Sequence, residues 1–180
     1  GCYAAWLTPQ GRMLCDLHVL QSDGMTLLDL PADEADKAAE WLELYHFTED
    51  VAIVNLGESL ASTWLHGPRA AAVLGKTVDL GGGPGFEAWT DYQHGRGTLG
   101  GAPVVVARID QLGVPGFLVY ADPRASEAVA SAFVEAGALV ASPSTLEAAR
   151  VDAGYPLFGL DMTHDTIPLE AGIEDRAISM

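Results

Sequence analysis

Basic residues are scarce in this sequence. Only 9 Lys and Arg stand against 25 Asp and Glu in 180 residues, which gives a formal net charge of −16. Proteins that bind DNA or RNA normally carry a basic face that neutralises phosphates, and anionic membrane surfaces likewise attract basic segments. The composition therefore argues against direct binding of nucleic acid or of a membrane surface, and the excess of acid favours solubility.

Long hydrophobic runs and clustered metal ligands are also missing. No stretch approaches the ~20 apolar residues of a membrane helix, and no signal peptide is visible. Cys2 and Cys15 lack C-x-x-C spacing, and the five histidines are scattered. His164, beside Asp161 and Asp165, could be a ligand or a solvated loop histidine. We expect no metal site and a reducing, cytoplasmic location.

Apolar residues nevertheless make up 49% of the sequence, enough for a packed core. Apolar segments bounded by turn residues predict strands early and in the middle of the chain. The turns at 9–11 and 22–24 join the first three strands as hairpins. The predicted strands are 2–8, 12–20, 25–30, 51–56, 61–65, 102–110 and 116–120.

Helical patterns alternate with these strands. Pro31 and the acids after it begin a helix with Ala38, Trp41, Leu42 and Tyr45 on one face. We expect Trp41 and Tyr45 to lie in the core rather than to contact a cofactor. Further helices are predicted at 69–74 (ended by Gly75), at 122–136, and from Ser142-Pro143-Ser144 through Ala149 or beyond. The mixture indicates an α+β fold with antiparallel sheets and packed helices.

Three segments show no clear pattern. The glycine-rich 81–85 lacks the Lys-Ser/Thr of a phosphate loop and no clear helix follows it, so a surface loop is expected. We expect 86–101 to be irregular and the chain from residue 154 onward to be an extended loop.

Two carboxylates are candidates for chemistry, whereas the G-x-S-x-G elbow of a serine nucleophile is absent. Asp16 interrupts an otherwise apolar strand, where it must face solvent, a partner or a ligand because burial of a lone charge is costly. Asp152 follows a helical pattern. It is either a helix-end residue or a carboxylate that accepts paired hydrogen bonds from a heterocycle.

A colinear series of motifs resembles one known family. It contains the hairpin from Tyr3 to Asp16, the segment 65–70, Arg108 with the glycine-containing stretch 113–120, Arg150-Val151-Asp152-Ala153-Gly154, and Pro168-Leu169-Glu170. Together these segments resemble the YgfZ / glycine-cleavage T-protein (GcvT-like) folate-binding superfamily over nearly the whole chain. Both ends look cut, so residues 1–180 are expected to be a partial domain that lacks an N-terminal segment and a C-terminal signature and barrel.

The resemblance implies tetrahydrofolate as cofactor. It places Asp16 and Asp152 in the folate pocket, with Asp16 as the catalytic residue. It makes Arg108 and Arg150 weaker candidates, because each could pair with the glutamate tail of folate or form a structural ion pair.

Within the superfamily the segment 167–173 is more similar to the YgfZ branch. This implies an accessory protein for iron–sulfur cluster assembly or repair, with iron–sulfur proteins as partners and indirect support of tRNA-modifying enzymes. Cys15 stands where T-proteins carry the first of two acids, which argues against aminomethyl transfer. The alternatives are a folate-dependent aminomethyltransferase of the glycine cleavage system and a non-catalytic structural remnant.

Overall fold

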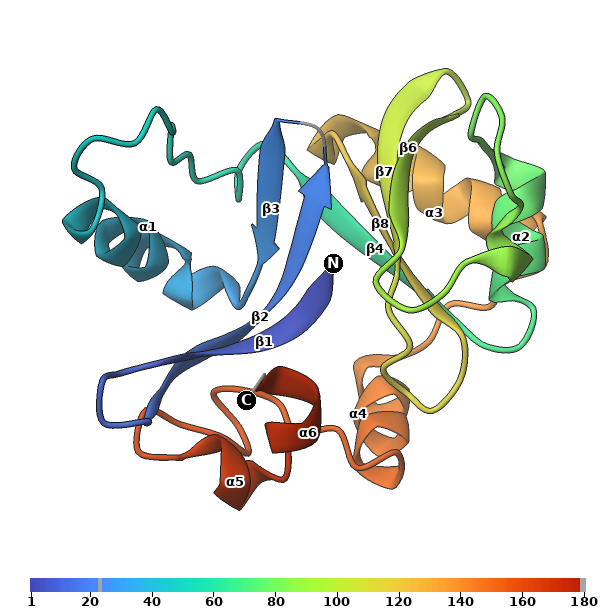
Figure 1. Ribbon diagram of the computed structural model, residues 1–180. Helices are drawn as coiled ribbons and strands as arrows, with labels where there is room; N and C mark the ends of the chain where they lie inside the picture. Colours follow the sequence, from blue (N-terminus) through green and yellow to red (C-terminus); the bar gives the residue numbers. More distant parts are fainter. Residues whose placement is uncertain (23, 179–180) are drawn as a thin grey trace. The chain divides into compact units, whose positions relative to one another are not determined.

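The computed structural model describes residues 1–22 and 24–178 (Figure 1). The chain divides into two compact units. One contains Gly1 and Leu60–Pro156, and the other contains Cys2–Ser59 and Leu157–Met180. Each unit holds an antiparallel sheet accompanied by helices, so the α+β prediction is confirmed.

The discontinuous unit begins with the two predicted hairpins. Its sheet has the order β1-β2-β3, with strands Cys2–Leu7, Met13–Ser22 and Met25–Asp29. Gly11 has φ +81° and Gly24 has φ +73°, conformations that glycine adopts without strain. Asp23 of the second predicted turn lies outside the described residues, as do Ser179 and Met180. The short helix η1 (Ala32–Glu34) and α1 (Ala35–Leu44) follow.

One face of this sheet is closed by the end of the chain. Met13 and Cys15 on β2 are fully buried with Met162 and Ile173. Residues 168–177 form two short helices, α5 (Pro168–Ala171) and α6 (Glu174–Ala177). The prediction of an extended loop from residue 154 was therefore wrong. One-turn helices are too short to display a periodic pattern, and burial of Ile173 holds them in place.

Two predictions after the third strand were also wrong. Helix α1 forms and Trp41 packs edge-on against Trp6, with ring centroids 5.7 Å apart, but Tyr45 follows the end of the helix and is 75% exposed rather than in the core. Residues 51–56 form no strand. Val51 and Val54 are exposed, so this short apolar run has neither a core nor a pairing partner in the described part of the chain.

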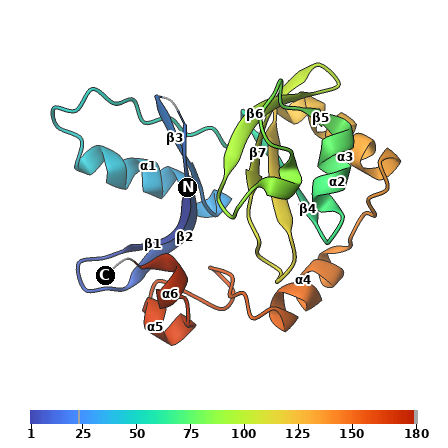
Figure 2. The same ribbon diagram turned by 45° about the vertical axis from the view of Figure 1, so that its right-hand side comes forward.

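The continuous unit is built on a five-stranded antiparallel sheet of order β4-β8-β7-β6-β5. Helices α2 and α3 cover one face (Figure 2) and bury a core that includes Leu74, Phe117 and Phe133. Its strands are β4 (Ala61–His66), β5 (Val78–Asp79), β6 (His94–Leu99), β7 (Ala102–Arg108) and β8 (Gly116–Ala121). Its helices are α2 (Ala70–Thr77), η2 (Phe86–Ala88), η3 (Pro123–Ala125), α3 (Ser126–Glu135) and α4 (Pro143–Asp152). In the described part of the chain, no helix is long and apolar enough to cross a membrane.

Strand β6 lies inside the segment predicted to be irregular. Its sequence is polar and contains two glycines, so it carries no strand signal. Close packing requires glycine at position 97, because a side chain there would meet the Asp79 carbonyl oxygen at 2.7 Å. A side chain at Gly95 would lie 3.4 Å from the Trp89 ring, which is an ordinary contact distance. The glycine-rich loop 81–85 is exposed and leads only into η2, as expected for a surface loop.

Two glycine-to-alanine changes should have opposite effects on stability. Gly97→Ala forces its new methyl group against the backbone of β5 and should cost about 1–3 kcal/mol. Gly75→Ala meets nothing within 4 Å and lies inside α2, which continues to Thr77 instead of ending at Gly75 as predicted. This change should stabilise the protein by about 0.5–1 kcal/mol. Urea unfolding of both variants tests the pair, and a destabilised Gly75→Ala or an unaffected Gly97→Ala would contradict it.

Candidate functional site

Asp16 lies on the central strand β2 of the three-stranded sheet, on the face away from the Met13–Cys15–Ile173 core. It is partly buried and opposite Ala5 of β1. The Tyr3 hydroxyl donates a hydrogen bond of 2.8 Å to its Oδ2. The neighbouring strand β1 thus supplies one fixed donor to Oδ2 of Asp16, and the other carboxylate oxygen, Oδ1, takes no part in this hydrogen bond.

The environment of Asp16 favours its neutral form. Burial raises the pKa of the Asp16 carboxyl above its ordinary value, and the negative charge of Asp29 acts in the same direction. The Tyr3 hydrogen bond and His18 oppose this rise. A partly buried carboxyl with a raised pKa is typical of functional sites, because it can exchange a proton or meet a cationic or N–H group.

The neighbours of Asp16 were not predicted from the sequence. His18 is 7% exposed, and its Nδ1 lies 3.2 Å from Asp29 Oδ2. The Tyr3 and His18 ring centroids are 5.6 Å apart, and the Arg176 guanidinium lies over the Tyr3 ring at 5.7 Å. Because side chains alternate along a strand, the sequence alone places Asp16 and His18 on one face of β2. Their contacts with Tyr3 on β1 and Asp29 on β3 depend on the pairing register of the strands, which the sequence does not show.

Cys15 points to the opposite face of β2. It is fully buried in the core. Burial, together with the charges of Asp16 and Glu34, raises the pKa of the thiol to about 12, so it stays protonated at neutral pH. The acid that T-proteins carry at this position would not share the face of Asp16. The substitution therefore says little about chemistry at Asp16.

Asp152 and Arg150 lie at the end of α4, in the other unit. Asp152 is exposed. Arg150 donates to both oxygens of Glu147, one turn earlier, and to the Tyr155 carbonyl oxygen. The ion-pair alternative for Arg150 is thus realised, while Asp152 presents its carboxylate to solvent.

Arg108 ends β7 in the same unit as α4. It forms a bidentate ion pair with Asp110, at 2.8 Å from Nη2 to Oδ2, and donates to the Trp89 carbonyl oxygen. This pairing raises the pKa of the guanidinium further. The Tyr155 hydroxyl donates to the Asp110 carbonyl oxygen at 2.8 Å, which ties the segment after α4 to the Arg108–Asp110 pair. The unit thereby brings Arg108 into one connected network with Arg150.

His164 contacts the Glu34 side chain and the backbone of Met13. Its Nε2 lies 3.5 Å from Glu34 Oε1, and its Nδ1 lies 3.4 Å from the Met13 carbonyl oxygen. The same Glu34 carboxylate accepts two hydrogen bonds of 3.0 Å from Lys37. Residues 1–22 and 24–178 contain no group of three or more His, Cys, Asp or Glu side chains that could hold a metal ion.

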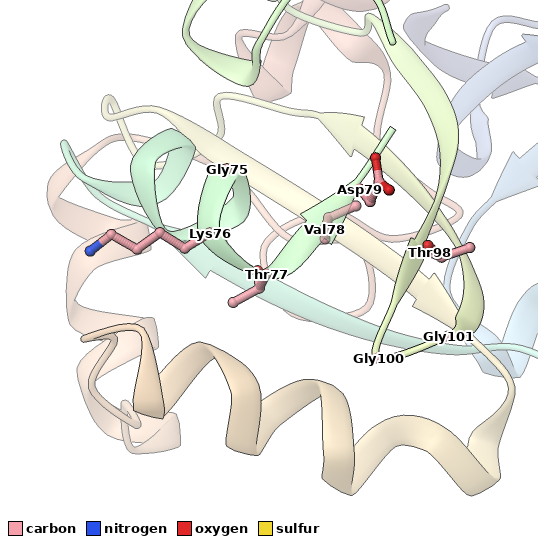
Figure 3. A pocket seen from close by; sticks show the side chains of 8 residues that line it. All are labelled: Gly75, Lys76, Thr77, Val78, Asp79, Thr98, Gly100 and Gly101. Carbon is pink, nitrogen blue, oxygen red and sulfur yellow. The ribbon is translucent and has the colours of Figure 1, made fainter. Parts of the chain in front are cut away.

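A shallow hollow of about 460 Å³ lies in the continuous unit, where α2 meets β5 and the turn between β6 and β7 (Figure 3). Lys76 extends away from the Asp79 and Thr98 side chains. The Asp79 carboxylate accepts a hydrogen bond from the Gly81 amide. Glycines and backbone form much of the lining, and none of the predicted site residues belongs to it, so the hollow is not assigned to the chemistry of Asp16.

Comparison with known proteins gives a consistent result. A family model described as the GCVT N-terminal domain matches residues 1–180. Aminomethyltransferases of Synechococcus elongatus and Picosynechococcus sp. are 30% and 27% identical, each over 95% of this chain and 46% and 47% of their own length. The crystal structure of the glycine cleavage system aminomethyltransferase T from Bartonella henselae matches 99% of this chain and 47% of that one, with TM-score 0.75 and 22% identity.

These findings correct the functional expectation. The relatives carry the name aminomethyltransferase, whereas nothing in the comparisons points to the YgfZ branch or to iron–sulfur proteins as partners. The role in iron–sulfur cluster assembly, with its link to tRNA modification, was therefore the wrong reading. It rested on the short segment 167–173, which is too small to separate branches of one superfamily. The chain spans about half the length of the curated relatives it matches, and it belongs to the GCVT N-terminal domain family.

Proposed function

We propose that this chain is the folate-binding part of a tetrahydrofolate-dependent aminomethyltransferase, the T protein of a glycine cleavage system. Relatives named aminomethyltransferase that align with 95% of the chain support the proposal. The observation that carries it is the partly buried Asp16 carboxyl with its raised pKa, held by the Tyr3 hydroxyl. The activity is proposed for a longer protein, because the relatives are about twice as long.

The contacts of Asp16 support the proposal of a folate ligand beside it. Tetrahydrofolate supplies ring and bridging nitrogens that accept a one-carbon unit. When ionised, Asp16 accepts a hydrogen bond from such an N–H group or stabilises a positive charge beside it. Tyr3 fixes the direction of the carboxylate by donating to Oδ2. Because burial favours the neutral acid, Asp16 can also hold a proton at its carboxyl during transfer.

Asp152, Arg108 and Arg150 are secondary members of the proposal. The exposed Asp152 carboxylate can accept paired hydrogen bonds from the amino and ring N–H groups of a pterin. Arg108 and Arg150 are already paired with Asp110 and Glu147. We assign them to holding the β7–β8 and α4 segments in place rather than to the glutamate tail of folate.

Calorimetric titration of the longer protein with tetrahydrofolate tests the proposal. Asp152→Ala should weaken binding about 10-fold, since hydrogen bonds to a charged group contribute about 1.5–3 kcal/mol and an exposed group lies at the low end. Asp165→Ala is a matched control because Asp165 is an exposed carboxylate paired only with Arg12 among the described residues, and it should bind normally. Absence of saturable binding by the folded wild-type protein would overturn the folate assignment and favour the structural remnant.

A further inference from the structure

The hydrogen bond that directs Asp16 depends on the orientation of the Tyr3 ring. The Tyr3 hydroxyl donates to Asp16 Oδ2 at 2.8 Å. Tyr3 is half-buried and belongs to β1, an edge strand of the described sheet, so β2 adjoins it on one side only. A side chain at such a position keeps rotamer freedom unless further contacts restrict it. The ring therefore needs a contact from outside the sheet to keep its hydroxyl on Asp16.

Helix α6 supplies that contact. It packs against β1 within the discontinuous unit (Figure 1). Ile173, immediately before the helix, is fully buried, and Ala177, its last residue, is buried as well, so both ends of α6 are fixed in the core that Tyr3 also contacts. Between these two residues, Arg176 places its guanidinium carbon Cζ 5.7 Å from the centroid of the Tyr3 ring. This distance is within the range of about 6 Å for a cation–π contact.

We propose that Arg176 is a positioning residue for Asp16 that acts through Tyr3. The guanidinium is a permanent cation and is attracted to the face of the Tyr3 ring. This attraction holds the ring in the orientation in which its hydroxyl reaches Asp16. Arg176 itself is exposed and is assigned no contact with folate. Its role rests on the proposed function, in which Asp16 is the group that meets tetrahydrofolate.

Paired substitutions separate this relay from a direct effect of the Arg176 charge. In the folate-free longer protein, labelled with ¹³C at aspartate carboxyl groups, the Asp16 signal is assigned by its loss in Asp16→Asn and followed with pH by NMR. Tyr3→Phe should raise the Asp16 titration midpoint, because the lost hydrogen bond favours the ionised carboxylate. Arg176→Met should raise it by about 0.3–0.7 pH unit, since an exposed cation–π contact shifts an equilibrium about 2- to 5-fold. When Tyr3→Phe is already present, Arg176→Met should add nothing.

Two further variants serve as controls. Arg176→Lys keeps a cation that can lie over the Tyr3 ring, so its shift should be smaller than that of Arg176→Met, and equal shifts would contradict the cationic role. Arg124→Met removes an exposed arginine of the other unit and should leave the midpoint unchanged. The remaining titratable groups near Asp16 and Arg176 are the same in every variant, so their effects cancel in the comparison. They are His18 of β2, Asp29 of β3, and Glu174 and Asp175 of α6.

Two outcomes would overturn the inference: a midpoint that Arg176→Met leaves unchanged, or an equal rise with and without Tyr3→Phe, which a direct charge effect would produce. Calorimetric titration with tetrahydrofolate gives the matching result in binding. Arg176→Met should weaken binding about 2- to 5-fold, and only where Tyr3 is intact. Failure of folate to bind the wild type would sink the proposed function, while the folate-free NMR titration still decides whether Arg176 acts on Asp16 through Tyr3.

Discussion

Asp16→Asn should weaken tetrahydrofolate binding about 10- to 150-fold, because it removes a charge-assisted hydrogen bond worth about 1.5–3 kcal/mol. Asparagine keeps the shape of the side chain and an oxygen that can accept from the Tyr3 hydroxyl. Isothermal titration calorimetry of the longer protein measures the loss directly. Binding within twofold of the wild type would contradict the assignment of Asp16.

The same variant should have a distinct pH signature. Because the Asp16 pKa is raised in the folded protein, its ionisation opposes folding: stability is fully present below the ordinary aspartate pKa and declines as pH rises through the folded value. Asp16→Asn removes this decline, so its melting temperature at pH 7 should equal or exceed that of the wild type. Loss of binding together with a lower melting temperature would indicate misfolding instead of a lost ligand contact.

Phe117→Ala should be among the most destabilising single changes, at about 3–5 kcal/mol. Phe117 on β8 is fully buried in the core under α2 and α3, and it meets Phe86 edge-on with ring centroids 5.9 Å apart. Truncation leaves a cavity at the centre of a close-packed core. Guanidinium unfolding followed by tryptophan fluorescence measures the change.

Phe47→Ala is the matched control for that experiment. Phe47 is 80% exposed, in the segment after α1. Its truncation should change the free energy of unfolding by no more than about 0.5 kcal/mol. Equal effects of the two substitutions would mean that the buried core of the five-stranded sheet is not where the structure places it.

Strong local patterns allowed much of the fold to be predicted. The hairpin strands show apolar segments bounded by Gly and Pro turns, and α3 shows an apolar face, so both were found. Strand β6 was missed because its sequence is polar and because tertiary packing selects Gly97, where Asp79 and Val78 leave no room for a side chain. The strand predicted at 51–56 did not form because its apolar run has no pairing partner among residues 1–22 and 24–178.

The candidate site was likewise predicted only in part from the sequence. Asp16 was found because a carboxylate inside an apolar strand is locally anomalous. Tyr3 and Asp29 were missed because they join Asp16 and His18 only through the register of three strands, which no single segment encodes. The reading of Cys15 as a lost acid overlooked the alternation of a strand, which turns residue 15 to the core.

The discontinuous unit has a consequence for synthesis on the ribosome. Arg12 and Asp165, joined by a hydrogen bond, are 153 residues apart, and the Met13 amide donates to the Thr166 carbonyl oxygen. At ordinary translation rates the apolar face of the first three strands waits on the order of ten seconds for the segment that covers it. Residues 60–156 are continuous and can fold during that interval. Until the last segment emerges, the nascent chain exposes Met13 and Leu17, so substitutions such as Ile173→Ala will lower the yield of soluble protein more than their effect on the finished fold suggests.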